Sequence, residues 1–479
     1  MLPTHNAATV FAMQSKAFPA MHNLNGWGST FWPLHAGRKI SARPLVCPFP
    51  RESKHALGAG VETAAGTGAG AAGVLAVAAT VGRCTYGERN SLWLSQELER
   101  LLSVQRRPGD GLVLTRGQWS WDLQEDDHYQ LIGKMQFHNI TERFEIFVPE
   151  VHGKIQLLAR ISLNSISSSV QILPRHPDGN PAPRKDGYWP AYIIRAGEST
   201  SIEVSVDISS KEGRSLKELQ AARLEMEYIS YGPHGRSTHV QHVILPLQYR
   251  DIHSSNTRWR NISARPESSL LPIHTHLLSH LDDPLEVLRR YVLPHAEAGD
   301  VIAIGETPLA IMQGRFRHPR TVQPGLVAGL ACRLFHPTSS LATACGMQAL
   351  VDISGRLRVV LAVFIAVIAR ILGQRGVFYQ VAGEQARLID DITGTLPPYD
   401  QFITLGPVRV QATVNALRAK TGCEVAIVDV NDLKKVHILA ASHGVDHHFL
   451  KDALIDNPAG NADEQTPIIL LRKRTNSTC

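Results

Sequence analysis

The chain has 479 residues and a formal net charge of +6, which is enough length for two or three domains with separate hydrophobic cores. The positive charge is concentrated at the N-terminus. Residues 1–86 carry seven Lys or Arg and two acidic residues, whereas residues 87–479 carry 42 basic and 41 acidic residues. A nearly neutral main body excludes an extended basic surface, so we expect no nucleic-acid partner.

Residues 1–86 contain no Asp and are rich in Ala, Gly, Ser, Thr and Pro. This acid-poor, basic composition is typical of organelle transit peptides, and we expect targeting to a chloroplast, with the mitochondrion as the alternative. A generic disordered tail has a similar composition. Residues 68–73 match the spacing G-x-G-x-x-G, but no strand precedes them, so they do not indicate a dinucleotide site.

Two apolar stretches bear on membrane association. Residues 64–82 are uncharged but consist mainly of Gly and Ala, so a membrane anchor there is the less favoured interpretation. Residues 359–369 are more apolar, but Arg370 ends the run after eleven residues. That length is too short to cross a bilayer and predicts a buried or interfacial helix.

The six cysteines are scattered and form no C-x-x-C motif. They predict neither a disulfide framework nor a structural zinc site, which fits a reducing compartment.

Residues 92–104 have leucines at helical spacing, and we expect a helix and linker over residues 87–108. Residues 109–250 change to short β-branched or aromatic runs separated by Pro, Gly and Asp, which predicts an immunoglobulin-like β-sandwich. Within it, residues 216–228, LKELQAARLEMEY, are interpreted as a helix. This domain contains no recognisable catalytic set, so we expect it to bind a protein partner.

Residues 251–270 are polar and rich in Ser and Asn, which predicts a linker. Residues 271–474 alternate between helical and strand patterns. The segment DDPLEVLRRYVLPH predicts a helix with Asp282 and Asp283 at its start and Pro284 in its first turn. The segments GDVIAIGE, CEVAIVDVNDL and TPIILLR predict buried strands. The predicted fold is therefore an N-terminal β-sandwich followed by a mixed α/β domain.

Two acidic segments flank predicted strands of the α/β domain. Asp429, Asn431 and Asp432 close one strand, and Asp463 and Glu464 precede the last one. Carboxylate and amide oxygens are ligands for hard cations, and a site for metals and phosphates needs several carboxylates. The alternative is that each segment is an ordinary turn. A metal site requires the two strand ends to meet around a shared cation.

Two further clusters contain charged or histidine side chains. Glu384, Arg387 and Asp391 share a face at helical spacing, which most often means a solvated ion-pair ladder, and Tyr399 and Asp400 follow on a loop that could contact a ligand.

His276 and His280 are four residues apart and would share a metal if the segment were helical. No H-E-x-x-H pattern is present, so core packing is the favoured role of His274, His276 and His280.

The segments GDVIAIGETPLAIMQGR, VAIVDVNDL and NADEQTPIILLR, in that order, make residues 271–472 resemble the coenzyme F-420 gamma-glutamyl ligase domain. The resemblance is closest to the branch found in cyanobacteria and photosynthetic eukaryotes. Members of this family use GTP to activate a carboxylate as an acyl phosphate, which the amine of L-glutamate then attacks. The resemblance implies Mg²⁺ or Mn²⁺, a small substrate bearing phosphate or carboxylate, and compatibility with a homodimer.

Carried over residue by residue, the resemblance implies metal ligands, cofactor contacts and catalytic arginines. The metal ligands are Asp429, Asn431, Asp432, Asp463 and Glu464; the cofactor contacts are Gly299, Asp300, Asn461 and Gln465; the arginines that would meet phosphate or carboxylate are Arg315 and Arg387.

One departure from the family bears on GTP. The family carries a Ser-Lys pair at the nucleotide phosphates, whereas this chain has Ala310 and Ile311 at those positions. An apolar side chain cannot replace an ammonium donor to phosphate. Two functions therefore stay open: a nucleotide- and metal-dependent amide ligase, and a non-catalytic descendant that binds a ligand or a protein partner.

Overall fold

The computed structural model describes residues 111–125, 128–160, 162–210, 216–248, 258–337, 339–374, 376–390, 396–431, 434–460 and 464–473. The expected transit peptide, the uncharged segment 64–82 and the helix expected over residues 92–104 lie outside the described residues.

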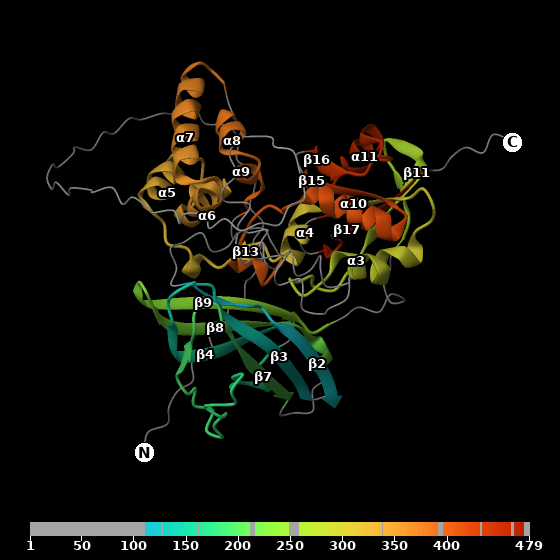
Figure 1. Ribbon diagram of the computed structural model, residues 1–479. Coiled ribbons are helices and arrows are strands. Elements are labelled where there is room, and N and C mark those ends of the chain that lie inside the picture. Colours follow the sequence, from blue (N-terminus) through green and yellow to red (C-terminus); the bar gives the residue numbers. More distant parts are fainter. Residues whose placement is uncertain are drawn as a thin grey trace, which may run out of the picture. The chain divides into compact units, whose positions relative to one another are not determined.

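The first domain consists of two antiparallel sheets packed face to face (Figure 1), so the predicted β-sandwich is confirmed. One sheet has the order β1 (Leu112–Leu114), β3 (His128–Asn139), β7 (Ser199–Ser210) and β5 (Ile166–Arg175), with β2 (Gln118–Glu125) beside β3. The other has the order β6 (Tyr192–Ile194), β4 (Ile146–Ala159), β8 (Leu219–Gly232) and β9 (Gly235–Pro246).

Alternation of side chains explains why these segments form a sandwich. In β7 every second residue from Thr200 to Ile208 is buried, so one face of the strand is apolar and points between the sheets. Aromatic side chains fill the centre of this core, with the rings of Phe137 and Tyr228 edge to face at 5.0 Å between centroids.

The helix expected over residues 216–228 is wrong. A single 3-10 turn covers Leu216–Glu218, and the remainder belongs to β8, which pairs with β4 on one side and β9 on the other. Leu, Glu, Ala and Arg favour helices in isolation, but a central strand gains two ladders of backbone hydrogen bonds and a buried face. Leu224 and Met226 are fully buried on this strand.

The second domain is built on a mixed sheet in the order β10 (Arg260–Ile262), β11 (Arg265–Ile273), β17 (Ile468–Lys473), β12 (Val301–Gly305), β15 (Glu424–Asn431) and β16 (Lys435–Ala441). Strands β12 and β15 are parallel, whereas the other described neighbours are antiparallel. The hairpin of β10 and β11 occupies the second half of the predicted linker 251–270, because its apolar residues complete the sheet edge beside β17.

Helices cover both faces of this sheet. One face packs against α3 (Pro284–Val287), α4 (Glu306–Met312) and α10 (Val410–Thr421), and the other against α11 (His447–Leu454). The predicted helix start is confirmed, because the Asp283 carboxylate accepts hydrogen bonds from the backbone N–H groups of Leu285 and Glu286. Pro284 occupies the first turn as expected.

A helical unit with its own core lies in the chain between two short paired strands, β13 (Phe316–Arg317) and β14 (Ile403–Thr404). Its helices are α5 (Leu326–Ala331), α6 (Ala344–Ser354), α7 (Arg356–Ile371), α8 (Val377–Ala382) and α9 (Gln385–Leu388). The helix expected over residues 359–369 is therefore present within α7. Within the described part of the chain, helices long and apolar enough to span a membrane are absent.

Candidate functional site

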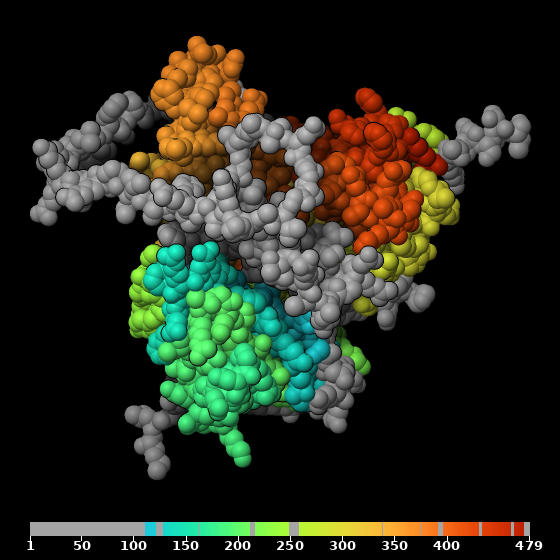
Figure 2. Space-filling view, viewed as in Figure 1, coloured from blue at the N-terminus to red at the C-terminus, as the bar shows by residue number. Residues whose placement is uncertain are grey.

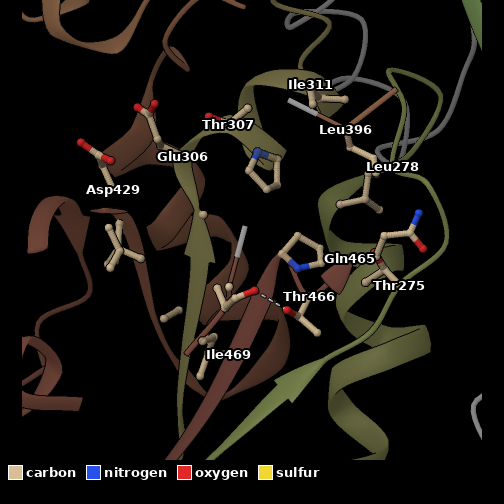
Figure 3. Close-up of a pocket in the computed structure, with 18 of the residues that line it drawn as sticks. Thr275, Leu278, Glu306, Thr307, Ile311, Leu396, Asp429, Gln465, Thr466 and Ile469 are labelled. Atoms are coloured by element: carbon tan, nitrogen blue, oxygen red, sulfur yellow. Dashed lines mark hydrogen bonds between the residues drawn. The ribbon is translucent and has the colours of Figure 1, made fainter. Parts of the chain in front are cut away.

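A cavity of ≈ 330 Å³ lies at the carboxyl ends of the parallel strands β12 and β15. Glu306 follows β12, and Asp429 lies near the end of β15 (Figure 3). The segment before β17 reaches the same edge, because the Gly305 N–H donates to the Pro467 carbonyl at 3.0 Å. Ligands of open α/β sheets bind outside the carboxyl ends of strands, so this edge is the candidate site.

Glu306 is the first residue of α4, and 7 % of its surface is exposed. Its Oε2 atom has no hydrogen-bond partner among the described residues. Burial, reinforced by the nearby carboxylates of Asp390 and Asp429, raises the pKa of Glu306 to about 9. The side chain is therefore protonated and neutral at physiological pH when the cavity holds no cation.

Asp429 is the second carboxyl group of the site. Burial raises its pKa, while the neighbouring charges of His437 and Arg387 act in the opposite direction. Figure 3 shows the carboxyl groups of Glu306 and Asp429 on one side of the cavity. Asp390 adds a third carboxylate, which accepts a hydrogen bond from the Thr307 hydroxyl at 3.4 Å.

The remaining wall is largely apolar. Leu278, Ile311, Leu396 and Ile469 line it, together with the ring of Tyr399. None of the described residues that line the cavity is Lys or Arg. Fixed positive charge is therefore absent from the described wall, and an anionic group would need a cation to accompany it.

Of the two positions that the resemblance aligns with the family's Ser-Lys pair, Ile311 forms part of this apolar wall. Ala310 is fully buried, and Ile311 faces the cavity. Ile311, one of the two residues that differ from the family, therefore lies in the same cavity as the carboxyl groups of the site.

His276 lies at the cavity wall but is fully engaged. Its Nδ1 is 2.8 Å from the Tyr291 hydroxyl and its Nε2 is 2.9 Å from Asp282 Oδ1. The segment is not helical, so His276 and His280 do not share a helix face. His280 packs edge-on against Phe316, and both histidines are buried, which confirms the core-packing interpretation for these two residues.

Gly299 and Asp300 lie at the other end of β12 from Glu306. Asp300 is 2 % exposed, and both of its carboxylate oxygens accept hydrogen bonds from Arg472, at 2.9 Å and 2.8 Å. Asp300 also accepts from the Glu297 N–H. Gly299 has φ +92 in this turn, a conformation that favours glycine. The geometry gives these two residues a structural role at the start of the strand.

The two predicted arginines occupy different environments. Arg315 is 4 % exposed, and its guanidinium donates to the Gly406 carbonyl at 2.7 Å and to Gln385 Oε1 at 3.2 Å. Burial, with a smaller effect of Arg317, lowers its pKa to about 10. Arg387 is exposed on α9, close enough to Asp429 for its charge to act on that carboxylate. Arg387 is thus the arginine that a bound ligand could reach.

The segment before β17 is described in part. Gln465 lines the cavity with φ +51, and Glu464 is exposed, its carboxyl group lying against Gly460. Asn461, Asp463 and Asp432 lie outside the described residues, and so does the side chain of Asn431. Within the described ranges, no group of three or more His, Cys, Asp or Glu side chains is arranged to hold a metal ion.

Sequence reasoning identified Asp429 and Gln465 at this site but missed Glu306. The available signal was its position directly after the buried run VIAIG, at the tip of a strand. That signal becomes informative only when β12 is known to lie between β15 and β17. Asp390 directly precedes Asp391, which the sequence places on a solvated helix face, and its proximity to Glu306 depends on the tertiary structure.

Residues 113–249 match the model of a protein family described as "F420-0:gamma-glutamyl ligase, N-terminal Ig-like domain". The sandwich is Ig-like. The match supports a relationship with the gamma-glutamyl ligase family, and it rests on the β-sandwich, a different part of the chain from residues 271–472, which carry the resemblance in sequence.

No curated protein matches the chain. Solved structures that are similar to part of it include a protein from Archaeoglobus fulgidus, with 12% identity and a TM-score of 0.18, covering 29% of this chain and 99% of that chain. The GAE domain of GGA2p from Saccharomyces cerevisiae has 9% identity and a TM-score of 0.17, covering 29% and 94%. These similarities carry no information on function.

Proposed function

We propose that this chain is a divergent gamma-glutamyl-ligase-like protein that binds a divalent cation, Mg²⁺ or Mn²⁺, together with a small substrate bearing phosphate or carboxylate. The observation that carries the proposal is the pair of carboxyl groups at Glu306 and Asp429, at the tips of neighbouring parallel strands. The unpartnered, buried Oε2 of Glu306 supports it, because a buried polar atom requires a partner.

The residues present fit a hard cation. Mg²⁺ is commonly held by one or two carboxylates, with waters and substrate phosphates completing its shell. Glu306 and Asp429 supply two carboxyl groups, and Asp390 is available to orient them or a bound water. A bound cation would neutralise charge on the oxygens of a phosphate or an acyl phosphate.

The chain's own residues have separate tasks in this proposal. Arg387, whose charge acts on Asp429, attracts an acidic end of the substrate, and Leu278, Leu396 and Ile311 exclude water from the cavity. Because the described lining residues include neither Lys nor Arg, phosphate binding depends on the cation. We therefore expect a nucleotide to bind only when the cation is present.

As the second candidate function, the protein is a non-catalytic descendant of the family that binds the ligand without converting it. Ala310 and Ile311 favour it, since this wall cannot supply the ammonium group with which the family meets nucleotide phosphates. The Ig-like sandwich would then dock a protein partner.

Thermal unfolding of the full chain tests the binding site. We expect Mn²⁺ to raise the midpoint, GTP or ATP alone to leave it unchanged, and both together to raise it further as their concentrations increase. The double variant Glu306→Gln/Asp429→Asn should lose these shifts, whereas Glu286→Gln, an exposed acid paired with Arg289, should keep them. Equal shifts in the double variant and the wild type would contradict the site.

Turnover separates the two functions. Mass spectrometry of reactions with glutamate, a nucleotide and candidate carboxylic acids would detect an amide product together with released phosphate. Cation-dependent nucleotide binding without any amide product would support the non-catalytic alternative.

We also propose a chloroplast location, on the composition of residues 1–86. A fluorescent fusion to these residues should enter chloroplasts, and the mature N-terminus should lie beyond residue 50. A mature protein that retains its first fifty residues would contradict this.

A further inference from the structure

Helix α7 exposes an apolar stripe along its full length. Phe364 is 64% exposed at its middle, and Leu357 and Ile371 are 86% and 81% exposed near its ends. The whole stripe consists of Leu357, Val360, Leu361, Phe364, Val367, Ile368, Ile371 and Leu372. Their spacing of three and four residues places them on one arc of about 140°, at 100° per residue.

The residues that α7 turns toward its own domain are small. Val359, Ala362 and Ala369 are buried, the first two in the core of the helical unit, while the larger side chains point to solvent. This arrangement reverses the usual amphipathic pattern, in which the largest apolar residues face the core. Figure 2 shows the orange α7 segment at the surface. An exposed apolar surface of this length indicates an interaction site.

A second apolar line runs along α5, the neighbour of α7. Leu326 and Leu330 of α5 are 87% and 66% exposed, and Leu334, in the turn that follows, is 55% exposed. All three residues are aliphatic, as are seven of the eight in the α7 stripe. A helix face rich in Leu and Phe, with Arg beside it, is typical of helices that lie in the membrane interface.

The charge around the stripe identifies the surface it fits. Residues 326–382 contain five arginines and one acidic residue, Asp352, which is paired with Arg317 at 2.7 Å. Arg356 and Arg358 border the two sides of the stripe on the helical wheel, and Arg370 lies at its C-terminal end. Two copies of this face would bring like charges together, whereas an anionic surface would neutralise them.

We propose that α7 and α5 bind the surface of a membrane containing anionic lipids. The stripe enters the boundary between headgroups and acyl chains, and the arginines pair with lipid phosphates. The contact is interfacial, because the stripe covers one side of α7 while the opposite side packs against the helical unit. The proposal is independent of the cation site, since none of the stripe residues lines that cavity.

Co-sedimentation of the full chain with vesicles tests the proposal. The vesicles are phosphatidylcholine alone, and phosphatidylcholine with about one third phosphatidylglycerol. We expect binding to the anionic vesicles that weakens as salt increases, since exposed charges are screened. The stripe variant Leu361→Ser/Phe364→Ser/Ile368→Ser should reduce the partition coefficient at least about tenfold.

Matched variants control for surface apolarity and charge. Ile140→Ser/Phe144→Ser/Ile193→Ser removes three comparably exposed residues of the sandwich and should leave binding unchanged. Arg356→Gln/Arg370→Gln should weaken binding to anionic vesicles, whereas Arg143→Gln/Arg160→Gln, also exposed, should have a smaller effect. Thermal unfolding of each variant should match the wild type, because exposed side chains contribute little to stability.

Three outcomes would overturn the proposal. The stripe variant could sediment as the wild type does, which would place membrane binding elsewhere in the chain. Binding could be equal with and without anionic lipid and insensitive to the arginine variant. The wild type could fail to bind vesicles and instead form a dimer, with the stripe variant monomeric. The stripe would then be a contact between two copies of the chain.

Discussion

Glu306 and Asp429 each lie one residue beyond a register pair of parallel strands, Gly305 of β12 and Val428 of β15. Two carboxyl groups are thereby held near one another in a partly enclosed cavity. Burial raises the pKa of both groups, and the carboxylates of Asp390 and Asp429 raise that of Glu306 further, so Glu306, the more buried of the two, stays protonated. Strongly perturbed carboxyl groups of this kind concentrate at functional sites.

The first prediction concerns stability against pH. The folded-state pKa of Glu306, about 9, lies above its ordinary value of 4.5. The contribution of Glu306 to the free energy of unfolding is therefore complete below its unfolded-state pKa and is lost as the pH rises through its folded-state pKa. Relative to Glu306→Gln, the free energy of unfolding of the wild type should fall by a few kcal/mol between about pH 5 and pH 9.

Urea unfolding at several pH values measures this difference without added cations. Glu464→Gln, which removes an exposed acid nearby, serves as the control and should follow the wild type. Parallel pH profiles for the wild type and Glu306→Gln would show that Glu306 is ionised in the folded protein.

The second prediction concerns proton release on metal binding. A divalent cation favours the carboxylate form of Glu306, so binding of Mn²⁺ near pH 7.5 should displace roughly one proton. Titration calorimetry in buffers with different ionisation enthalpies measures that number. Glu306→Gln should bind more weakly and release fewer protons. Tight binding with no dependence on the buffer would rule out Glu306 as a ligand.

The third prediction separates a structural carboxylate from a ligand-binding one. The buried Asp300 and the half-buried Arg472 form a bidentate pair at the end of β12 away from the cavity. Asp300→Asn should destabilise the fold by about 3 kcal/mol, because it removes the buried carboxylate of the pair and leaves the partly buried guanidinium with only the exposed Glu297 as a counter-charge. The Asp300→Asn variant should bind Mn²⁺ with the same affinity as the wild type when affinity is measured below the lower unfolding temperature of the variant. A selective loss of affinity would restore Asp300 to the predicted cofactor site.

The fourth prediction distinguishes the two arginines. Arg315→Ala should cost about 2–3 kcal/mol of stability, since it leaves the buried Gly406 carbonyl without its donor. Arg387→Gln should leave stability within about 0.5 kcal/mol, because the side chain is exposed. It should nevertheless weaken binding of an anionic substrate to the cation-loaded protein. The reverse assignment of effects would make Arg315 the ligand contact.

Local patterns predicted much of the secondary structure. The β-branched and aromatic runs within residues 109–250 predicted the strands of the sandwich, the apolar run VIAIG predicted β12, and Asp283 with Pro284 predicted a helix start. These features depend on side chains close together in the chain, so they can be read without knowledge of the partners. Local patterns gave the wrong prediction for residues 216–228, because hydrogen bonds to two neighbouring strands, β4 and β9, stabilise a strand more than the helical preference of these residues stabilises a helix.

The sequence by itself determined that acidic residues stand at strand ends, and it named Asp429 among them. Only the tertiary structure decided which strand ends are neighbours. Glu306 lies beside Asp429, and Gln465 lies at the same edge of the sheet. Asp300 lies at the opposite end of β12, where it pairs with Arg472. The physical reason is that strand order and direction arise from hydrogen bonds between segments far apart in the chain. The pKa of a carboxyl group depends on those same distant neighbours.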